Sequence, residues 1–165
     1  ITELTGITNE LLERDGMDEL QAFKEFREFM ADHPLVGHNI IRFDNPILAR
    51  KIKTLLEEDW MTSGCYDTAG LFKAWYMDLK PSETEPVHDF CLRVMNMRSP
   101  VKFNLGHAHK VLGFDETGII AHRAAGDVEM VHRIYQDLEK KYADPPKQAT
   151  LDEIIEEKVS NPPVL

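Results

Sequence analysis

The chain has 165 residues, a length that suits one compact domain with a substantial core. Its 19 Lys and Arg against 29 Asp and Glu give a net charge of −10, which excludes a generally basic nucleic-acid coat but not a local basic groove. No apolar run approaches the roughly 18 residues of a membrane span, and the N-terminus lacks the pattern of a signal peptide.

The first part of the chain shows two helical patterns and then an apolar strand. Thr8 suits the N-cap of a short helix that Gly16 ends. From Asp18, apolar residues recur at helical spacing until 32–34, where a proline disfavours the helical conformation of the residue before it. The apolar run 35–41 then predicts a buried strand.

The middle of the chain repeats this alternation of helix and strand. Residues 43–57 return to helical spacing. Residues 64–68 predict a strand end, and Asp67 or Thr68 is suited to cap a helix over 69–76. A second strand and another helix are therefore expected here.

The last part of the chain is mainly helical. Residues 80–100, with three prolines, predict a loop around a short helix near 90–95. Longer helical patterns cover 103–112 and 122–142, and a short acidic helix is expected over 150–158.

Strands that alternate with helices predict an α/β fold around a largely parallel sheet. Two visible strands are too few to organise this many helices. The chain also begins without Met. We therefore expect the sequence to start inside a longer chain, or after processing, with the first strands of the fold absent.

Two segments could carry chemistry. The first is His38 to Asp44, where a carboxylate lies between a strand end and a helix start, the place where α/β folds bind ligands. The alternative is that Asp44 only caps the helix. The second is His122 to Asp127, in which a His could act as general base while the Asp holds a metal. The alternative there is an ordinary acid in the first turn of a helix.

Together these segments resemble the DEDDh 3′–5′ exonucleases, the DnaQ-like family of the polymerase III epsilon subunit and RNase T. His-Asn-x-x-x-Phe-Asp at 38–44 is similar to the second family motif, and His-x-Ala-x-x-Asp at 122–127 to the third. The Gly-Ile-Thr turn at 6–8 and the strand end at 65–68 follow the same order. The resemblance covers about 1–142.

The resemblance implies an RNase H-like fold, a mixed sheet flanked by helices, and a site for two Mg²⁺ or Mn²⁺ ions. Asp44 and Asp127 would be catalytic metal ligands, and His122 the catalytic general base. The first motif of the family, an Asp-x-Glu pair on an early strand, has no counterpart in this sequence. Two of the four expected metal-binding carboxylates are therefore missing.

The substrate implied is the 3′ end of DNA, single-stranded or frayed. Asn39 is expected to hold the loop or touch the substrate, and Phe43 to pack beneath the site. Lys102 and Arg123 are candidates for phosphate contacts. The alternative of an exoribonuclease with the same fold remains, because the sequence contains no motif that would recognise a 2′-OH and so distinguish RNA from DNA.

A third reading is a catalytically incomplete nuclease fold that serves as a binding or scaffold subunit of a polymerase or nucleic-acid processing complex. The expected organisation is an exonuclease domain over 1–143 and a C-terminal tail or linker over 144–165. Cys65 and Cys91 have apolar neighbours and are expected to be buried free thiols. They predict a reducing, cytoplasmic location without a membrane.

Overall fold

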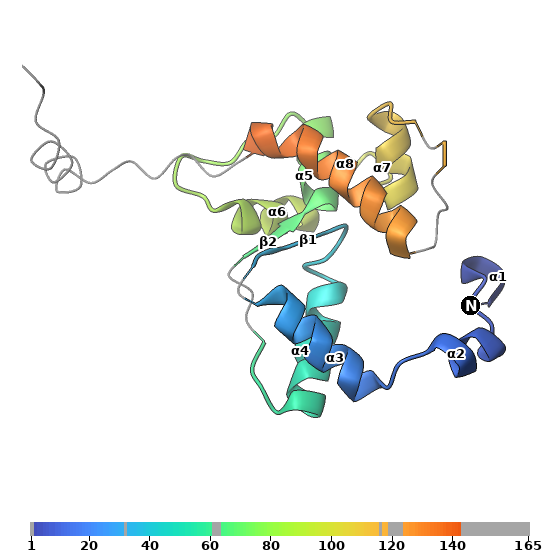
Figure 1. The fold of residues 1–165 in the computed structure, drawn as a ribbon. Helices are drawn as coiled ribbons and strands as arrows, with labels where there is room; N and C mark the ends of the chain where they lie inside the picture. Colours follow the sequence, from blue (N-terminus) through green and yellow to red (C-terminus); the bar gives the residue numbers. More distant parts are fainter. Residues whose placement is uncertain (1, 32, 61–63, 116, 119–123, 143–165) are drawn as a thin grey trace, which may run out of the picture.

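The computed structural model of the chain describes residues 2–31, 33–60, 64–115, 117–118 and 124–142. Within these ranges the chain is an α/β fold with one small sheet (Figure 1). Three helices come first, at α1 (Thr2–Thr5), α2 (Asn9–Asp15) and α3 (Glu19–Met30). In the described part of the chain, no helix has both the length and the apolar character needed to cross a bilayer.

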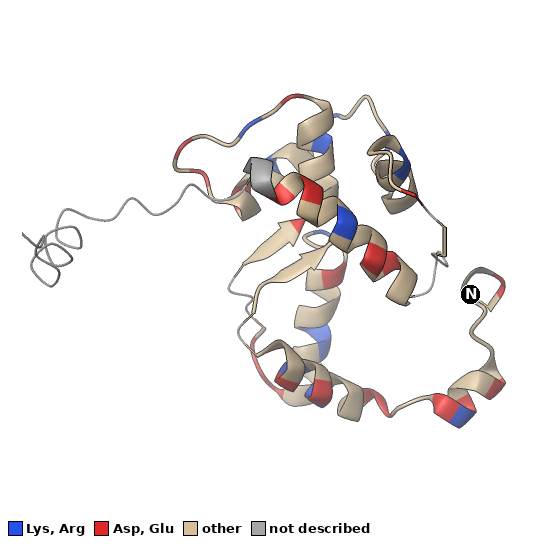
Figure 2. Cartoon of the chain, turned by 45° about the horizontal axis from the view of Figure 1, so that its top comes forward, with Lys and Arg blue, Asp and Glu red and all other residues tan. Residues whose placement is uncertain are grey.

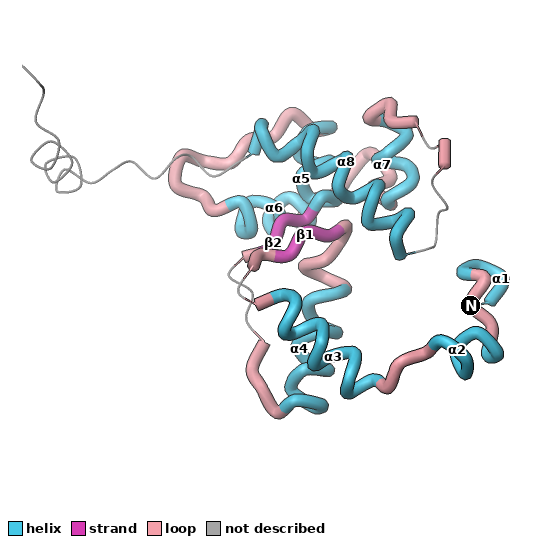
Figure 3. The backbone as a smooth tube through the Cα atoms, in the orientation of Figure 1, coloured by secondary structure: helices cyan, strands magenta, loops and turns pink. Residues whose placement is uncertain are grey.

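Two parallel strands lie at the centre of the molecule (Figure 3). They are β1 (Leu35–Gly37) and β2 (Cys65–Asp67), and α4 (Asp44–Leu56) connects them. The register places Gly37 beside Asp67 at the carboxyl ends of both strands. The carboxyl ends of two segments that are far apart in the sequence therefore lie side by side at one end of the sheet.

The other helices are α5 (Thr68–Tyr76), α6 (Val87–Asn96), α7 (Leu105–Val111) and α8 (Ala124–Tyr142). In Figure 1 these four lie on one side of the strands, while α3 and α4 pack together on the other. Both signs of charge are distributed along α3, α4 and α8 (Figure 2). The structure thus supports the predicted α/β class, with a two-stranded parallel sheet among the described residues.

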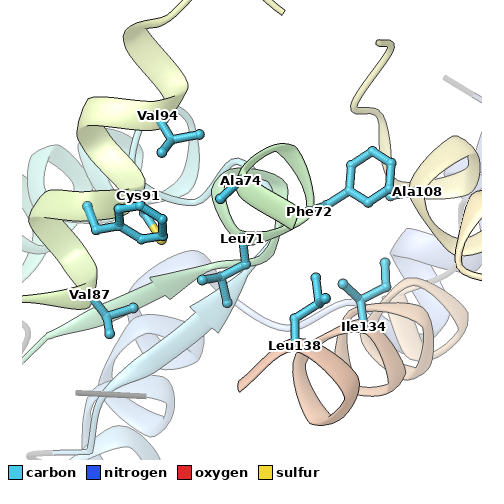
Figure 4. Close-up of a cluster of buried hydrophobic side chains, with 10 residues drawn as sticks. Leu71, Phe72, Ala74, Val87, Cys91, Val94, Ala108, Ile134 and Leu138 are labelled. Carbon is cyan, nitrogen blue, oxygen red and sulfur yellow. The ribbon is translucent and has the colours of Figure 1, made fainter. Parts of the chain in front are cut away.

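The hydrophobic core lies between α5, α6, α7 and α8 (Figure 4). Helix α5 is central, because every residue from Thr68 to Ala74 is buried. Phe72 and Leu71 of α5, Phe90 of α6 and Ile134 of α8 are all fully buried. A helix that is buried on all faces needs neighbours on every side, which explains why α5 contacts α6, α7 and α8.

Several boundaries agree with the sequence predictions. Thr8 caps α2 by accepting a hydrogen bond from Leu11 N, and Asp67 caps α5 by accepting from Ala69 N and Gly70 N. Cys65 and Cys91 are buried thiols that are not joined in a disulfide, as predicted. The helix expected over 150–158 lies outside the described residues.

Other boundaries differ from the predictions for identifiable reasons. The strand predicted over 35–41 ends at Gly37, because the chain turns at Asn39, whose φ is +63°. Helix α6 begins at Val87 rather than near 90, with Pro86 at its N-cap, where the Pro86 carbonyl oxygen accepts a hydrogen bond from Phe90 N. Phe43, and not Asp44, occupies the N-cap position of α4, so the alternative that Asp44 caps this helix is wrong.

Two glycines in helices provide a matched test of the packing. A Cβ added at Gly70 of α5 would lie 2.9 Å from Cβ of Cys91, whereas one added at Gly106 of α7 meets nothing within 4 Å. We expect Gly70→Ala to reduce the free energy of unfolding by about 1–3 kcal/mol through overpacking. Gly106→Ala should raise it by about 0.4–1 kcal/mol, because alanine loses less backbone entropy.

Urea unfolding curves of both variants measure these changes. If Gly70→Ala proved as stable as Gly106→Ala, the close packing of α5 against α6 would be contradicted.

Candidate active site

A cavity of about 650 Å³ lies beside β1 and brings the two sequence motifs together. Asp44 and Asp127 both line it, although they are far apart in the sequence, and they are the only carboxylates among its described lining residues. The remaining walls are mainly apolar and come from α3, β1, α4, α7 and α8. The cavity thus sits where a parallel α/β fold binds its ligands.

The 38–43 loop, between β1 and α4, delivers Asp44 to this cavity. Asp44 is the first residue of α4 and is exposed at the cavity rim. The surrounding protein nevertheless displaces enough water to raise the pKa of its carboxyl group, and the nearby charge of Asp67 adds to the rise. A hydrogen bond from its own backbone N–H acts in the opposite direction. A cation in the cavity would relieve this unfavourable concentration of negative charge.

The side chain of Asp67 holds the 38–43 loop in place through hydrogen bonds. It is fully buried and accepts hydrogen bonds from Asn39 N at 2.9 Å and Ile41 N at 3.2 Å. The same carboxylate accepts from the first N–H groups of α5, at Ala69 and Gly70. Its carboxylate oxygens are therefore engaged by backbone donors, and Asp67 is a structural residue at this site.

His38 forms a second connection between the loop and the core. Its Nε2 donates to the carbonyl oxygen of Phe103 at 2.6 Å, and its Nδ1 lies 3.0 Å from Oγ1 of Thr68. Burial lowers the pKa of His38, while the Phe103 carbonyl and the charge of Asp67 act in the opposite direction. The imidazole is therefore neutral at pH 7, with the proton on Nε2, because a carbonyl oxygen can only accept.

This lowered pKa predicts a dependence of stability on pH. Below the ordinary His value of 6.5, the unfolded chain binds a proton at His38 more readily than the folded chain does. The stability associated with a neutral His38 is complete above pH 6.5 and is lost as pH falls through the lower folded pKa. We expect His38→Gln to flatten the fall of melting temperature between pH 7 and pH 5.

The matched control is His132→Gln, which removes an exposed histidine of α8 and should leave the slope unchanged. Equal slopes for the wild type and His38→Gln would contradict the burial of a neutral His38.

Asp127 lies in the first turn of α8, as the sequence predicted. Its location fits both readings considered above, the metal ligand and the acid at a helix start, but its place in the cavity with Asp44 favours the first. The predicted general base His122 and the candidate phosphate contact Arg123 lie outside the described residues, immediately before α8 begins.

Of the candidate substrate-binding residues that the structure describes, Phe43 lines the cavity and the others do not. Phe43 lines the cavity with 62% of its surface exposed, and the expectation that it packs beneath the site stays a prediction. Asn39 and Lys102 are not among the cavity lining. Asn39 instead holds the loop through its backbone, and Lys102 is exposed next to Phe103, whose carbonyl binds His38.

Asp44 and Asp127 offer the oxygen ligands that Mg²⁺ and Mn²⁺ prefer. Among the described residues, however, no group of three or more His, Cys, Asp or Glu side chains could hold a metal ion. The residues present therefore fit part of the coordination of a divalent cation, and a site for two cations needs further carboxylates.

Sequence reasoning considered His38 only as part of a motif and Asp67 mainly as a helix cap. It missed that both also hold the loop that carries Asp44. The available signal was positional: the predicted strands 35–41 and 64–68 are each followed by a helix, and parallel strands bring their carboxyl ends side by side. In the structure these ends are Gly37 and Asp67.

The cavity lies beside β1 and is lined by one acidic residue at the start of α4 and one in the first turn of α8. This arrangement is typical of the α/β proteins that bind ligands at strand ends. Comparison with known families then gives the specific relationship. The chain belongs to the exonuclease family of the RNase_T type, whose family model matches residues 1–135. Membership implies an RNase H-like fold and points to hydrolysis of phosphodiester bonds.

Two curated relatives have the same printed name. The chain is 38% identical over 80 residues to the DNA polymerase III PolC-type of Bacillus subtilis (strain 168). This match covers 48% of this chain and 5% of the relative. It is 46% identical over 48 residues to the DNA polymerase III PolC-type of Mycoplasma genitalium. This second match covers 29% of this chain and 3% of the relative. The chain thus matches only a small part of the length of either protein.

Proposed function

We propose that this protein removes nucleotides from the 3′ ends of DNA, preferably single-stranded, by metal-dependent hydrolysis. The observation that carries the proposal is the meeting of Asp44 and Asp127 in one cavity, in a chain of the exonuclease family. The similarity to two DNA polymerase III proteins supports DNA as the substrate and proofreading within a polymerase complex as the role.

In this proposal Asp44 and Asp127 hold divalent cations, Mg²⁺ or Mn²⁺. When bound, these cations activate a water and stabilise the leaving oxygen of the phosphodiester. His122 accepts the proton of the attacking water as the water oxygen bonds to phosphorus and the bond to the 3′ oxygen breaks. Phe43, exposed at the cavity, stacks on the terminal base, and Arg123 and Lys102 contact phosphates.

We further propose that an extended segment with an Asp-x-Glu pair completes the site. Among the described residues, β1 pairs with β2 along one edge only, and all three residues of β1 line the cavity. Val36 of β1 is 36% exposed and Val128 of α8 is 66% exposed. Such apolar surface beside a strand edge suits a further strand, which would supply the two missing carboxylates.

The alternative is a catalytically incomplete scaffold within a polymerase or processing complex. It is favoured by one observation, namely that the described cavity residues include only two carboxylates. We propose residues 1–143 as the nuclease domain and 144–165 as a linker or docking tail, in a reducing, cytoplasmic location.

The test combines metal binding with 3′-end digestion by the natural protein at its full length. Mn²⁺ binding is measured by electron paramagnetic resonance, and digestion with a 5′-labelled single-stranded DNA and an RNA of the same sequence. Stepwise shortening of the DNA that needs Mn²⁺ and stops with EDTA supports the proposal. Shortening of the RNA alone indicates the exoribonuclease, and DNA binding without shortening indicates the scaffold.

A further inference from the structure

We propose that Asp67, His38 and Thr68 are positioning residues that fix Asp44 at the cavity by anchoring the 38–43 loop to the start of α5. This inference rests on the function proposed above, because it concerns the same site. It adds an explanation for how the carboxylate at the start of α4, beyond the 38–43 loop, is held in place.

The first anchor is the carboxylate of Asp67. One oxygen accepts from Asn39 N and the other from Ile41 N, so the two sides of the loop turn are fixed by one side chain. The oxygen that binds Asn39 also caps α5 through Ala69 N and Gly70 N. The position of the loop is thereby tied directly to the start of α5.

The second anchor is the contact of His38 with Thr68 and Phe103. Oγ1 of Thr68 lies 3.0 Å from Nδ1 of His38 and 3.2 Å from the carbonyl oxygen of Gly37, and its one hydroxyl proton can be donated to either of these acceptors. The Thr68 hydroxyl therefore reaches both the end of β1 and the first residue of the loop. Nε2 of His38 binds the segment before α7 through the Phe103 carbonyl.

Backbone hydrogen bonds and close packing constrain the loop between these anchors and Asp44. Phe43 N donates to the carbonyl oxygen of Asn39 at 3.0 Å, and Asn45 N donates to that of Ile40 at 2.9 Å. Ile40 is buried, and a Cβ added at Gly37 would lie 2.8 Å from its Cβ. A shift of either anchor is therefore carried along the loop to Asp44.

The test uses Thr68→Val, which removes the hydroxyl at similar size, and Thr68→Ser, which keeps the hydroxyl and removes the methyl group. Asp67→Asn serves as a second variant, because it replaces one acceptor oxygen with a donor that faces a backbone N–H. Ile134→Val in the core of α8 is the control for lost stability alone. Each is made in the natural full-length protein.

We expect Thr68→Val to lower Mn²⁺ affinity and kcat about tenfold, the scale typical of residues that orient metal ligands, with KM for DNA unchanged. Thr68→Ser should restore both values to within about twofold, and Asp67→Asn should act like Thr68→Val or more strongly. Hydrogen exchange of the Asn39 and Ile41 amides should become faster in Thr68→Val and Asp67→Asn but not in Ile134→Val.

The proposal is overturned if Thr68→Val matches Ile134→Val in Mn²⁺ affinity and in exchange at these two amides. It is also overturned if Thr68→Ser is as impaired as Thr68→Val, since the hydroxyl would then be irrelevant. Absence of Mn²⁺ binding by the wild type would overturn the proposed function together with this inference. Normal wild-type binding with unaffected variants would overturn the inference alone.

Discussion

Replacing His122 with alanine is expected to lower the rate of 3′-end digestion by about 10²–10⁴-fold, the usual contribution of a general base. The change removes the group proposed to accept the proton of the attacking water, whereas the carboxylates proposed to hold the cation remain. Mn²⁺ binding should therefore survive largely intact. Steady-state digestion of a labelled single-stranded DNA, with Mn²⁺ titrated in parallel, measures both effects.

The control for this prediction is His132→Ala, which removes an exposed histidine of α8 that does not line the cavity. It should leave digestion unchanged. An unaltered rate in His122→Ala would mean that the motif at 122–127 has been assigned the wrong role.

Replacing either Asp44 or Asp127 with asparagine is expected to reduce digestion by about a thousandfold and to weaken Mn²⁺ binding. Asparagine keeps the size of the side chain but removes the charge, and the loss corresponds to several kcal/mol of transition-state stabilisation. If both carboxylates hold the same cation, the double variant should be little worse than either single variant.

The matched control is Asp137→Asn, which removes an exposed carboxylate further along α8. Its Mn²⁺ affinity should equal that of the wild type. Wild-type affinity in Asp44→Asn or Asp127→Asn would contradict the assignment of that residue as a ligand. Simple additivity in the double variant would instead indicate two separate cation sites.

Much of the fold could be predicted from local sequence patterns. Thr8 and Asp67 carry oxygen atoms at the positions that helix starts need, and the apolar spacing of α8 is long and regular. These features depend on neighbouring residues, so periodicity and capping rules identify them. The end of β1 was harder to predict, because apolar residues lie on both sides of His38 and Asn39 in 35–41, and only the turn at Asn39 separates strand from loop.

The candidate site was predicted in part. The motifs selected Asp44 and Asp127, and the structure brings both to one cavity. The exposed position of Phe43 and the two roles of Asp67 depend on contacts between distant segments, such as the pairing of Gly37 with Asp67. A single sequence contains no direct signal for such contacts, and the spatial relation of His122 to the carboxylates remains a prediction.

The buried position of α5 has a consequence for how the site can fail. Local opening of a protein usually begins at segments with little buried surface, and α5 is buried from Thr68 to Ala74. Because the loop that carries Asp44 shares an acceptor, the Asp67 carboxylate, with Ala69 N of α5, releasing the loop means disturbing this buried helix. The active-site geometry should therefore be lost in the same cooperative transition that unfolds the domain, without a separate earlier step.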